Sequence, residues 1–128
     1  VIFINLFNSY NSNKSNNVSF TLNSDFNNVG SLSVGNDIKI HGVKVGEVTD
    51  ISINPDLFVA NVIIEFDNFY KLPSDSIFTI TSNGLMGGSY IDIKIGSSDL
   101  TFNENETTKY NIDAISIENI ISDIIFTD

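Results

Sequence analysis

The sequence predicts an all-β domain: a small closed barrel or a sandwich of about seven short strands, followed by a short amphipathic helix. Apolar and polar residues alternate through several short runs, as they do in half-buried strands. Glycine, asparagine and proline separate these runs at the spacing expected of turns. With 128 residues, the chain is long enough for one hydrophobic core but too short for two.

The first part of the domain predicts three strands. Residues 18–22 alternate as a first strand, and residues 25–35 form the connection after it, because they contain two glycines and have no period. Residues 37–48 have the pattern of two strands joined by a tight turn at Gly42. A bulge is expected at Gly46 in the second of these strands.

The middle of the chain predicts three more strands. The strand that follows Gly42 ends at the turn formed by residues 54–56. Residues 58–66 alternate cleanly as a long strand, with Phe58 as its first inward residue. Residues 76–81 form the next strand, and residues 90–95 follow with their isoleucines facing inward.

The last part of the chain changes its period. A polar loop at 97–108 leads to a final short strand at 110–112, and residues 114–128 then have apolar side chains at helical spacing. A strand at 115–117 is the alternative. The helical stripe comprises Ile117, Ile120, Ile121, Ile124 and Ile125. Because a helix this short is unstable alone, the stripe has to pack on its own barrel or on other subunits.

The barrel domain is therefore expected at 18–113, after an N-terminal segment of different character. Residues 1–7 are apolar but far too short to span a bilayer, which takes about 20 residues. They are either a short strand or the trailing end of a membrane anchor, and we favour the anchor. Residues 8–17 are rich in Asn and Ser and predict a flexible linker.

Composition excludes several classes of function. The net charge is −10, with six lysines and no arginine, which argues against nucleic acid and against adhesion to an anionic membrane surface. Solubility alone is a sufficient reason for the acidity. There is no cysteine, so disulfides and thiol chemistry are absent.

The sequence predicts no enzyme, no cofactor and no metal site. Its single histidine, His41, adjoins a turn glycine and has neither a cysteine nor an acidic pattern beside it, so we interpret it as structural. Zinc needs more nitrogen or sulfur ligands than the chain offers. Asp99, Glu104 and Glu106 lack EF-hand spacing, and a solvated acidic loop is favoured over a cation site.

The most informative segment is the loop at residues 82–90. Gly84 and Gly87 flank Leu85 and Met86, so that two large apolar side chains lie at a loop tip that would ordinarily be polar. Such a pair either folds back to plug the end of its own barrel or contacts a partner subunit or a lipid.

Four motifs in order resemble the MCE domain family, in particular its members in the Mla phospholipid-transport ABC system of Gram-negative bacteria. They are F-N-N-V-G-S-L at 26–32, G-V-K-V-G-E-V at 42–48, L-P-S-D-S at 72–76 and G-L-M-G-G-S-Y at 84–90. The resemblance covers about residues 18–126. Each motif alone is weak, but the four together with matching gaps are fairly specific.

The resemblance implies a seven-stranded barrel that binds phospholipid without enzymatic activity. It also implies a homo-hexameric ring, anchored in the inner membrane, on the periplasmic side, and joined to an ABC permease and its ATPase. Leu85 and Met86 of six copies would line an apolar pore, and the tails at 114–128 would gather as a helix bundle.

The chain departs from the family pattern in three respects. The anchor itself is missing, Asn103 to Asn105 stand where a glycine is usual before the last strand, and Met86 replaces a common leucine. The alternative function is a secreted or surface adhesion module that binds a host or protein partner. The sequence upstream of Val1 would separate the two, because an uncleaved anchor helix favours transport and a cleavable signal peptide favours adhesion.

Overall fold

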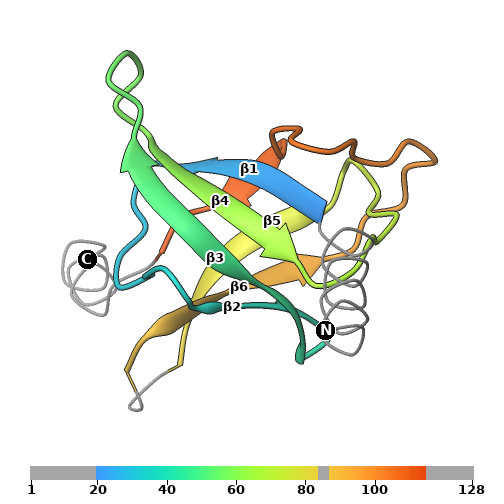
Figure 1. The fold of residues 1–128 in the computed structure, drawn as a ribbon, viewed down its shortest axis with the longest axis horizontal. Helices are drawn as coiled ribbons and strands as arrows, with labels where there is room; N and C mark the ends of the chain where they lie inside the picture. The colour runs from blue at the N-terminus through green and yellow to red at the C-terminus, as the bar shows by residue number, and fades with distance from the viewer. Residues whose placement is uncertain (1–19, 84–86, 115–128) are drawn as a thin grey trace, which may run out of the picture.

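The computed structural model describes residues 20–83 and 87–114, and these form a seven-stranded sheet that closes on itself (Figure 1). No helix occurs within these two ranges, and hence none that would cross a membrane. The strands are β1 (Phe20–Phe26), β2 (Asp37–Ile40), β3 (Val43–Ile53), β4 (Ala60–Phe66), β5 (Ile77–Ser82), β6 (Ser89–Lys94) and β7 (Tyr110–Ile112). The prediction of seven short strands is confirmed.

The strand order decides in favour of a barrel over a sandwich. The sheet runs β1-β4-β3-β2-β6-β5-β7, with parallel pairs at β2–β6 and β5–β7 and antiparallel pairs elsewhere. The sheet closes where Asn23 of β1 forms a parallel bridge with Thr107, in the segment that leads into β7. The amide of Asn23 donates to the carbonyl of Glu106 at 2.9 Å, and the amide of Thr108 donates to the carbonyl of Asn23 at 2.7 Å. Closure of this kind leaves little free strand edge.

The first strand is longer than predicted, because it includes two residues that we assigned to the following connection. Its inward positions continue through Ser24, which is fully buried, to Phe26. A polar residue at an inward position hid this continuation. The Ser24 hydroxyl lies 2.7 Å from the hydroxyl of Thr108, which itself donates to the side chain of Asn111 at 2.6 Å, so burial leaves no unpaired polar group there.

Buried apolar side chains from strands β1 to β6 fill the barrel interior, and four phenylalanine rings gather toward one end of it. The side chains of Phe20, Phe66, Phe78 and Phe102 are each at most 1% exposed. The rings of Phe20 and Phe66 lie 5.7 Å apart, and those of Phe78 and Phe102 lie 6.1 Å apart, within the range of favourable aromatic pairs. Phe102 comes from the loop that the sequence predicted to be polar, and it closes one end of the barrel.

The loop that carries Phe102 is held at its start by Asp75. The amides of Ser98 and Ser97 each donate to the Asp75 carboxylate at 3.0 Å, and these bonds hold the pKa of Asp75 below its usual value. A side chain at Gly96 would collide with this carboxylate. The Asp75 side chain therefore ties the turn before β5 to the loop that follows β6.

The third strand is bent by a bulge where it crosses the barrel. Its pairing with β2 shifts between Ile38 and Lys39, which face Gly46 and Lys44 and leave Val45 as the extra residue. This confirms the bulge expected at Gly46. A Cβ at Gly46 would collide with the backbone of Glu65 on the neighbouring strand, so the close approach of β3 and β4 requires glycine here.

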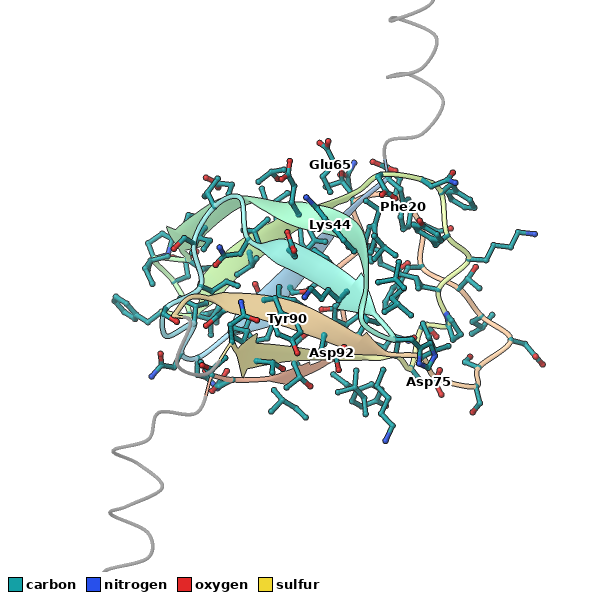
Figure 2. The ribbon with its side chains drawn as sticks, turned by 90° about the horizontal axis from the view of Figure 1, so that it is seen from below. Phe20, Lys44, Glu65, Asp75, Tyr90 and Asp92 are labelled. Carbon is teal, nitrogen blue, oxygen red and sulfur yellow. The ribbon has the colours of Figure 1, made fainter. Side chains whose placement is uncertain are left out.

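The outer face of the barrel carries charged and polar side chains together with exposed apolar ones such as Val43 and Ile53. Figure 2 shows Lys44 and Glu65 on the surface near Phe20, and Tyr90 and Asp92 on the outer side of β6. One inward assignment was wrong: Ile95 is 39% exposed, because β6 ends one residue earlier, at Lys94.

Substitution of Gly46 by alanine is expected to destabilise the domain by about 1–3 kcal/mol, because the neighbouring backbone has to move to accept the methyl group. For a domain of this size, each kcal/mol corresponds to a fall in Tm of roughly 4–8 °C, which calorimetry measures. Glu47→Ala is the matched control, since Glu47 is exposed and lies opposite the carboxylates of Asp37 and Glu65. Equal Tm values for the two variants would contradict the close approach of β3 and β4.

Candidate functional site

The connections that follow the odd-numbered strands all lie at one end of the barrel. All pairings agree with odd-numbered strands running one way and even-numbered strands the other. The connections 27–36, 54–59 and 83–88 therefore lie at the same end as Ala114, and we call this the loop end. The chain enters β1 at the opposite end, at Phe20. Figure 1 shows the β3–β4 and β5–β6 hairpins both projecting from the loop end, on the left of the view.

The predicted apolar loop lies at this end, between β5 and β6. Gly84, Leu85 and Met86 are outside the described residues, so the assignment of the two apolar side chains to the site stays a prediction. The flanks support a loop that depends on glycine: Gly87 and Gly88 have φ values of 76° and 75°, a region that disfavours other residues. The amide of Asn83 donates to the carbonyl of Gly88 at 3.2 Å and closes the base of the loop.

The predicted assembly helix and anchor remnant also lie outside the described residues. These untested assignments are residues 1–17 and the stripe formed by Ile117, Ile120, Ile121, Ile124 and Ile125. The described chain ends at Ala114, on the loop end. The segment that carries the stripe therefore leaves the barrel on the same side as the loop at 83–88.

A second apolar tip lies at the loop end, and sequence reasoning missed it. Leu57 is 69% exposed and Phe58 is 78% exposed, at the turn between β3 and β4. Phe58 was wrongly assigned to the fourth strand, because its apolar side chain continued the alternating pattern. The side chain of Asn54 instead accepts the amides of Asp56 and Leu57 at 2.9 and 3.2 Å, which shapes a turn in which Phe58 has a φ of 54°. The Asn-Pro-Asp signal followed by two large apolar residues would have indicated such a tip.

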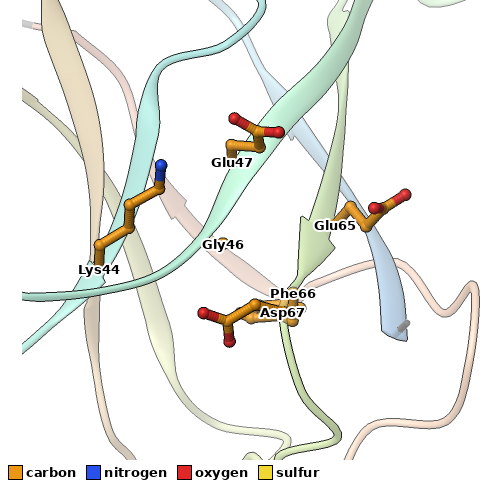
Figure 3. A pocket seen from close by; sticks show the side chains of 6 residues that line it. All are labelled: Lys44, Gly46, Glu47, Glu65, Phe66 and Asp67. Atoms are coloured by element: carbon orange, nitrogen blue, oxygen red, sulfur yellow. The ribbon is translucent and has the colours of Figure 1, made fainter. Parts of the chain in front are cut away.

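A surface groove of about 360 Å³ lies beside the β3 bulge (Figure 3). Its lining is mostly charged and comprises Lys44, Gly46, Glu47, Glu65, Phe66 and Asp67. Glu47 faces Asp37 on one neighbouring strand and Glu65 on the other, and Lys44 lies 3.5 Å from the Asp37 carboxylate. Such a lining does not suit an acyl chain, which needs apolar surroundings.

No group of three or more His, Asp or Glu residues within 20–83 and 87–114 is arranged to hold a metal ion. His41 is exposed in the β2–β3 turn with a φ of 52°. Glu106, one of the three acidic residues considered for a cation, accepts the amide of Asn103 at 2.8 Å. These residues shape turns, and the structure does not bring them together with the apolar loop.

The fold and the loop end define a scaffold class: a filled barrel that presents loops and a chain terminus at one end. A family model described as MlaD protein matches residues 19–96, and the chain belongs to this family. The family is one of binding proteins, which confirms the prediction of a non-enzymatic protein.

Curated relatives carry the name "Intermembrane phospholipid transport system binding protein MlaD". The protein of Escherichia coli strain K12 is 27% identical over 113 residues, which are 84% of this chain and 62% of that protein. The Haemophilus influenzae protein is 33% identical over 82 residues, which are 63% of this chain and 49% of that protein. The chain thus spans about half to two thirds of their lengths.

A solved structure confirms the fold. A chain of the "Acinetobacter MlaFEDB complex in ATP-bound Vtrans1 conformation" superposes with a TM-score of 0.75 at 17% sequence identity. The match covers 96% of this chain and 95% of that chain.

Phe58→Asn is expected to stabilise the domain by up to about 1 kcal/mol, because asparagine tolerates a positive φ better than phenylalanine does. The midpoint of urea unfolding measures the change. Leu57→Asn is the control, since it removes a similar exposed apolar side chain without relieving a positive φ, and it should change stability by less than about 0.5 kcal/mol. A Phe58→Asn protein less stable than the control would indicate that the ring packs against the domain.

Proposed function

We propose that the protein is the lipid-binding subunit of an Mla-type phospholipid transport system. It acts as a homo-hexameric ring on the periplasmic side of the inner membrane of a Gram-negative bacterium, held by an N-terminal anchor and joined to an ABC permease and ATPase. Phospholipid passes through an apolar pore on the ring axis. The observation that carries the proposal is the glycine-bounded loop with Leu85 and Met86 at the end of a barrel whose interior is filled.

The filled interior supports a conduit outside the barrel. A barrel of this size encloses just enough space for its own side chains. Fully buried side chains along the strands, among them Leu22, Ile64 and Ile91, occupy the interior, and four phenylalanine rings fill the end opposite the loop end, so little room is left for an acyl chain. A path for lipid then has to lie between copies of the domain, where loops from different subunits meet.

The loop between β5 and β6 is suited to line such a path. Regular pairing holds its strands as far as Thr81–Tyr90 and Ser82–Ser89, so the tip is carried on a stable hairpin. Leu85 and Met86 would offer acyl chains an apolar surface, and each CH₂ group kept from water is worth about 0.8 kcal/mol. The flexible thioether of Met86 suits chains of varied shape.

The positions of the first and last described residues support a ring that is anchored on one side. The first described residue, Phe20, lies at the end opposite to Ala114. An N-terminal anchor and a C-terminal assembly helix would then act from opposite ends of the barrel. The helix would lie on the same side as the apolar loop, so that assembly through the tails brings the loops together.

Assembly is expected to depend on the isoleucine stripe. Ile121→Asp combined with Ile124→Asp should yield a folded monomer, because the charges prevent burial of the stripe while the barrel core stays intact. Native mass spectrometry gives the particle mass, and circular dichroism checks the fold. Asn119→Asp adds a charge to the opposite face of the predicted helix and should leave the assembly unchanged. A double variant with the mass of the original particle would exclude the tail as the assembly element.

Leu85→Asn combined with Met86→Asn is expected to abolish lipid transport with little effect on stability, within about 0.5 kcal/mol, if the tips are exposed in each subunit. Complementation of a transport-deficient strain measures function, and thermal unfolding measures stability. Leu100→Asn is the control, because Leu100 is 71% exposed on a loop at the other end of the barrel.

The plug alternative for this loop makes the opposite prediction. If Leu85 and Met86 fold back onto the barrel end, their replacement would cost about 2–5 kcal/mol and lower the Tm. A strongly destabilised double variant, or a stable one that transports normally, would refute the pore-loop assignment.

A further inference from the structure

The connection between β1 and β2, residues 27–36, contacts two places that matter to the proposed function: the base of the β5–β6 loop and the exit of the chain after β7. It crosses the loop end of the barrel from Phe26 to Asp37. On one side it contacts the base of the loop at 83–88. On the other side it contacts the point at which the chain leaves the barrel toward the predicted assembly helix.

The contact with the loop is a hydrogen bond between two serines. The Oγ atoms of Ser31 and Ser89 lie 2.6 Å apart in a partly buried setting, and Ser89 is only 5% exposed. Ser89 is the first residue of β6 and directly follows Gly87 and Gly88. The side-chain bond adds to the backbone pairing of Ser89 with Ser82, so it helps to fix the point at which β6 begins, directly after two glycines that have little conformational preference of their own.

The contact with the chain exit consists of two hydrogen bonds and a close packing. The amide of Ala114 donates to the carbonyl of Asn28 at 3.0 Å, and the amide of Asn27 donates to the Asp113 carboxylate at 2.8 Å. Gly30, with a φ of 57°, lies so close to Ala114 that a Cβ at this position would be 2.7 Å from the Ala114 Cβ. The exit of the chain is thereby fixed to the same connection.

The connection itself is anchored in the barrel, so it can transmit position from one contact to the other. Leu32 is 6% exposed and belongs to the hydrophobic core. The amide of Gly35 donates to the carbonyl of Val48 at 2.8 Å, and the amide of Val48 donates to the carbonyl of Asn36 at 2.9 Å. These bonds attach the end of the connection, just before β2, to β3.

We propose that residues 27–36 are a brace that holds the base of the β5–β6 loop, at Gly87 to Ser89, in a defined position relative to the chain exit at Ala114, with Ser31 and Ser89 as positioning residues for lipid passage. This inference rests on the proposed function. The chain exit and the loop base both contact residues 27–36. In the proposed ring, assembly through the tails would therefore also position the loop bases. Loss of the Ser31–Ser89 bond would leave each subunit folded but would loosen the base of its loop.

The test compares Ser31→Ala and Ser89→Ala with a matched control, Ser24→Ala, in the full-length protein. Ser24 also loses a hydroxyl–hydroxyl bond, of 2.7 Å to Thr108, but at the β1–β7 seam rather than at the loop. The first readout is amide hydrogen exchange at Gly87, Gly88 and Ser89. We expect it to accelerate about two- to tenfold in the two brace variants and to stay unchanged in the control, because one hydrogen bond shifts a local equilibrium by roughly that factor.

The second readout is lipid transport by variants whose particle mass is unchanged. We expect a loss in Ser31→Ala and in Ser89→Ala, with no greater loss when the two are combined, and normal transport in Ser24→Ala even if its Tm falls more. Unchanged exchange at the loop base, or transport equal to that of the original protein in both brace variants, would overturn the brace.

The Leu85→Asn and Met86→Asn double variant separates failure of the brace from failure of the proposed function. If that variant loses transport while the brace variants retain it, the function stands and the brace is wrong. If the double variant transports normally, the proposed function is wrong, and hydrogen exchange alone then decides whether the connection positions the loop.

Discussion

The packing of apolar side chains inside a closed seven-stranded barrel is the constraint on which the rest of the molecule depends. Leu22, Ile64, Ile91 and the phenylalanine rings are buried within the described barrel, so its interior leaves little room for a ligand. The connections between strands then remain as candidate binding surfaces. The alternating strand directions divide these connections between the two ends of the barrel. The barrel is thus a rigid support whose chemical character lies in what it presents at the loop end.

The sequence predicted most of the strands because one face of each is buried. The clean alternation of Val62, Ile64 and Phe66 is the direct result of an inward and an outward face, and it needs no knowledge of partners. The predictions were wrong where a residue's polarity did not match its position, because a contact elsewhere in the structure determined that position. Ser24 is polar yet points inward, since Thr108 satisfies it from a distant part of the chain. Phe58 is apolar yet lies in a turn that the side chain of Asn54 stabilises.

The candidate site was predictable only in part, for a similar reason. The glycines around Leu85 and Met86 identify the loop from sequence alone, and Gly87 and Gly88 have φ values that few other residues tolerate. The contact between Ser31 and Ser89 joins residues 58 positions apart, and neither serine is distinctive in a serine-rich chain. The parallel pairing of β2 with β6 creates that contact, and periodicity carries no information about which strands become neighbours.

The seam between β1 and β7 gives the domain a particular response to mechanical load. The two strands run in the same direction, with Phe20 at the start of one and Ala114 just beyond the end of the other. Tension between these two residues would load the seam in shear, so that the bonds joining Asn23 to Glu106 and Thr108 would share the force and have to break together. The proposed anchor at one end and the proposed assembly at the other would load the domain along this shear direction.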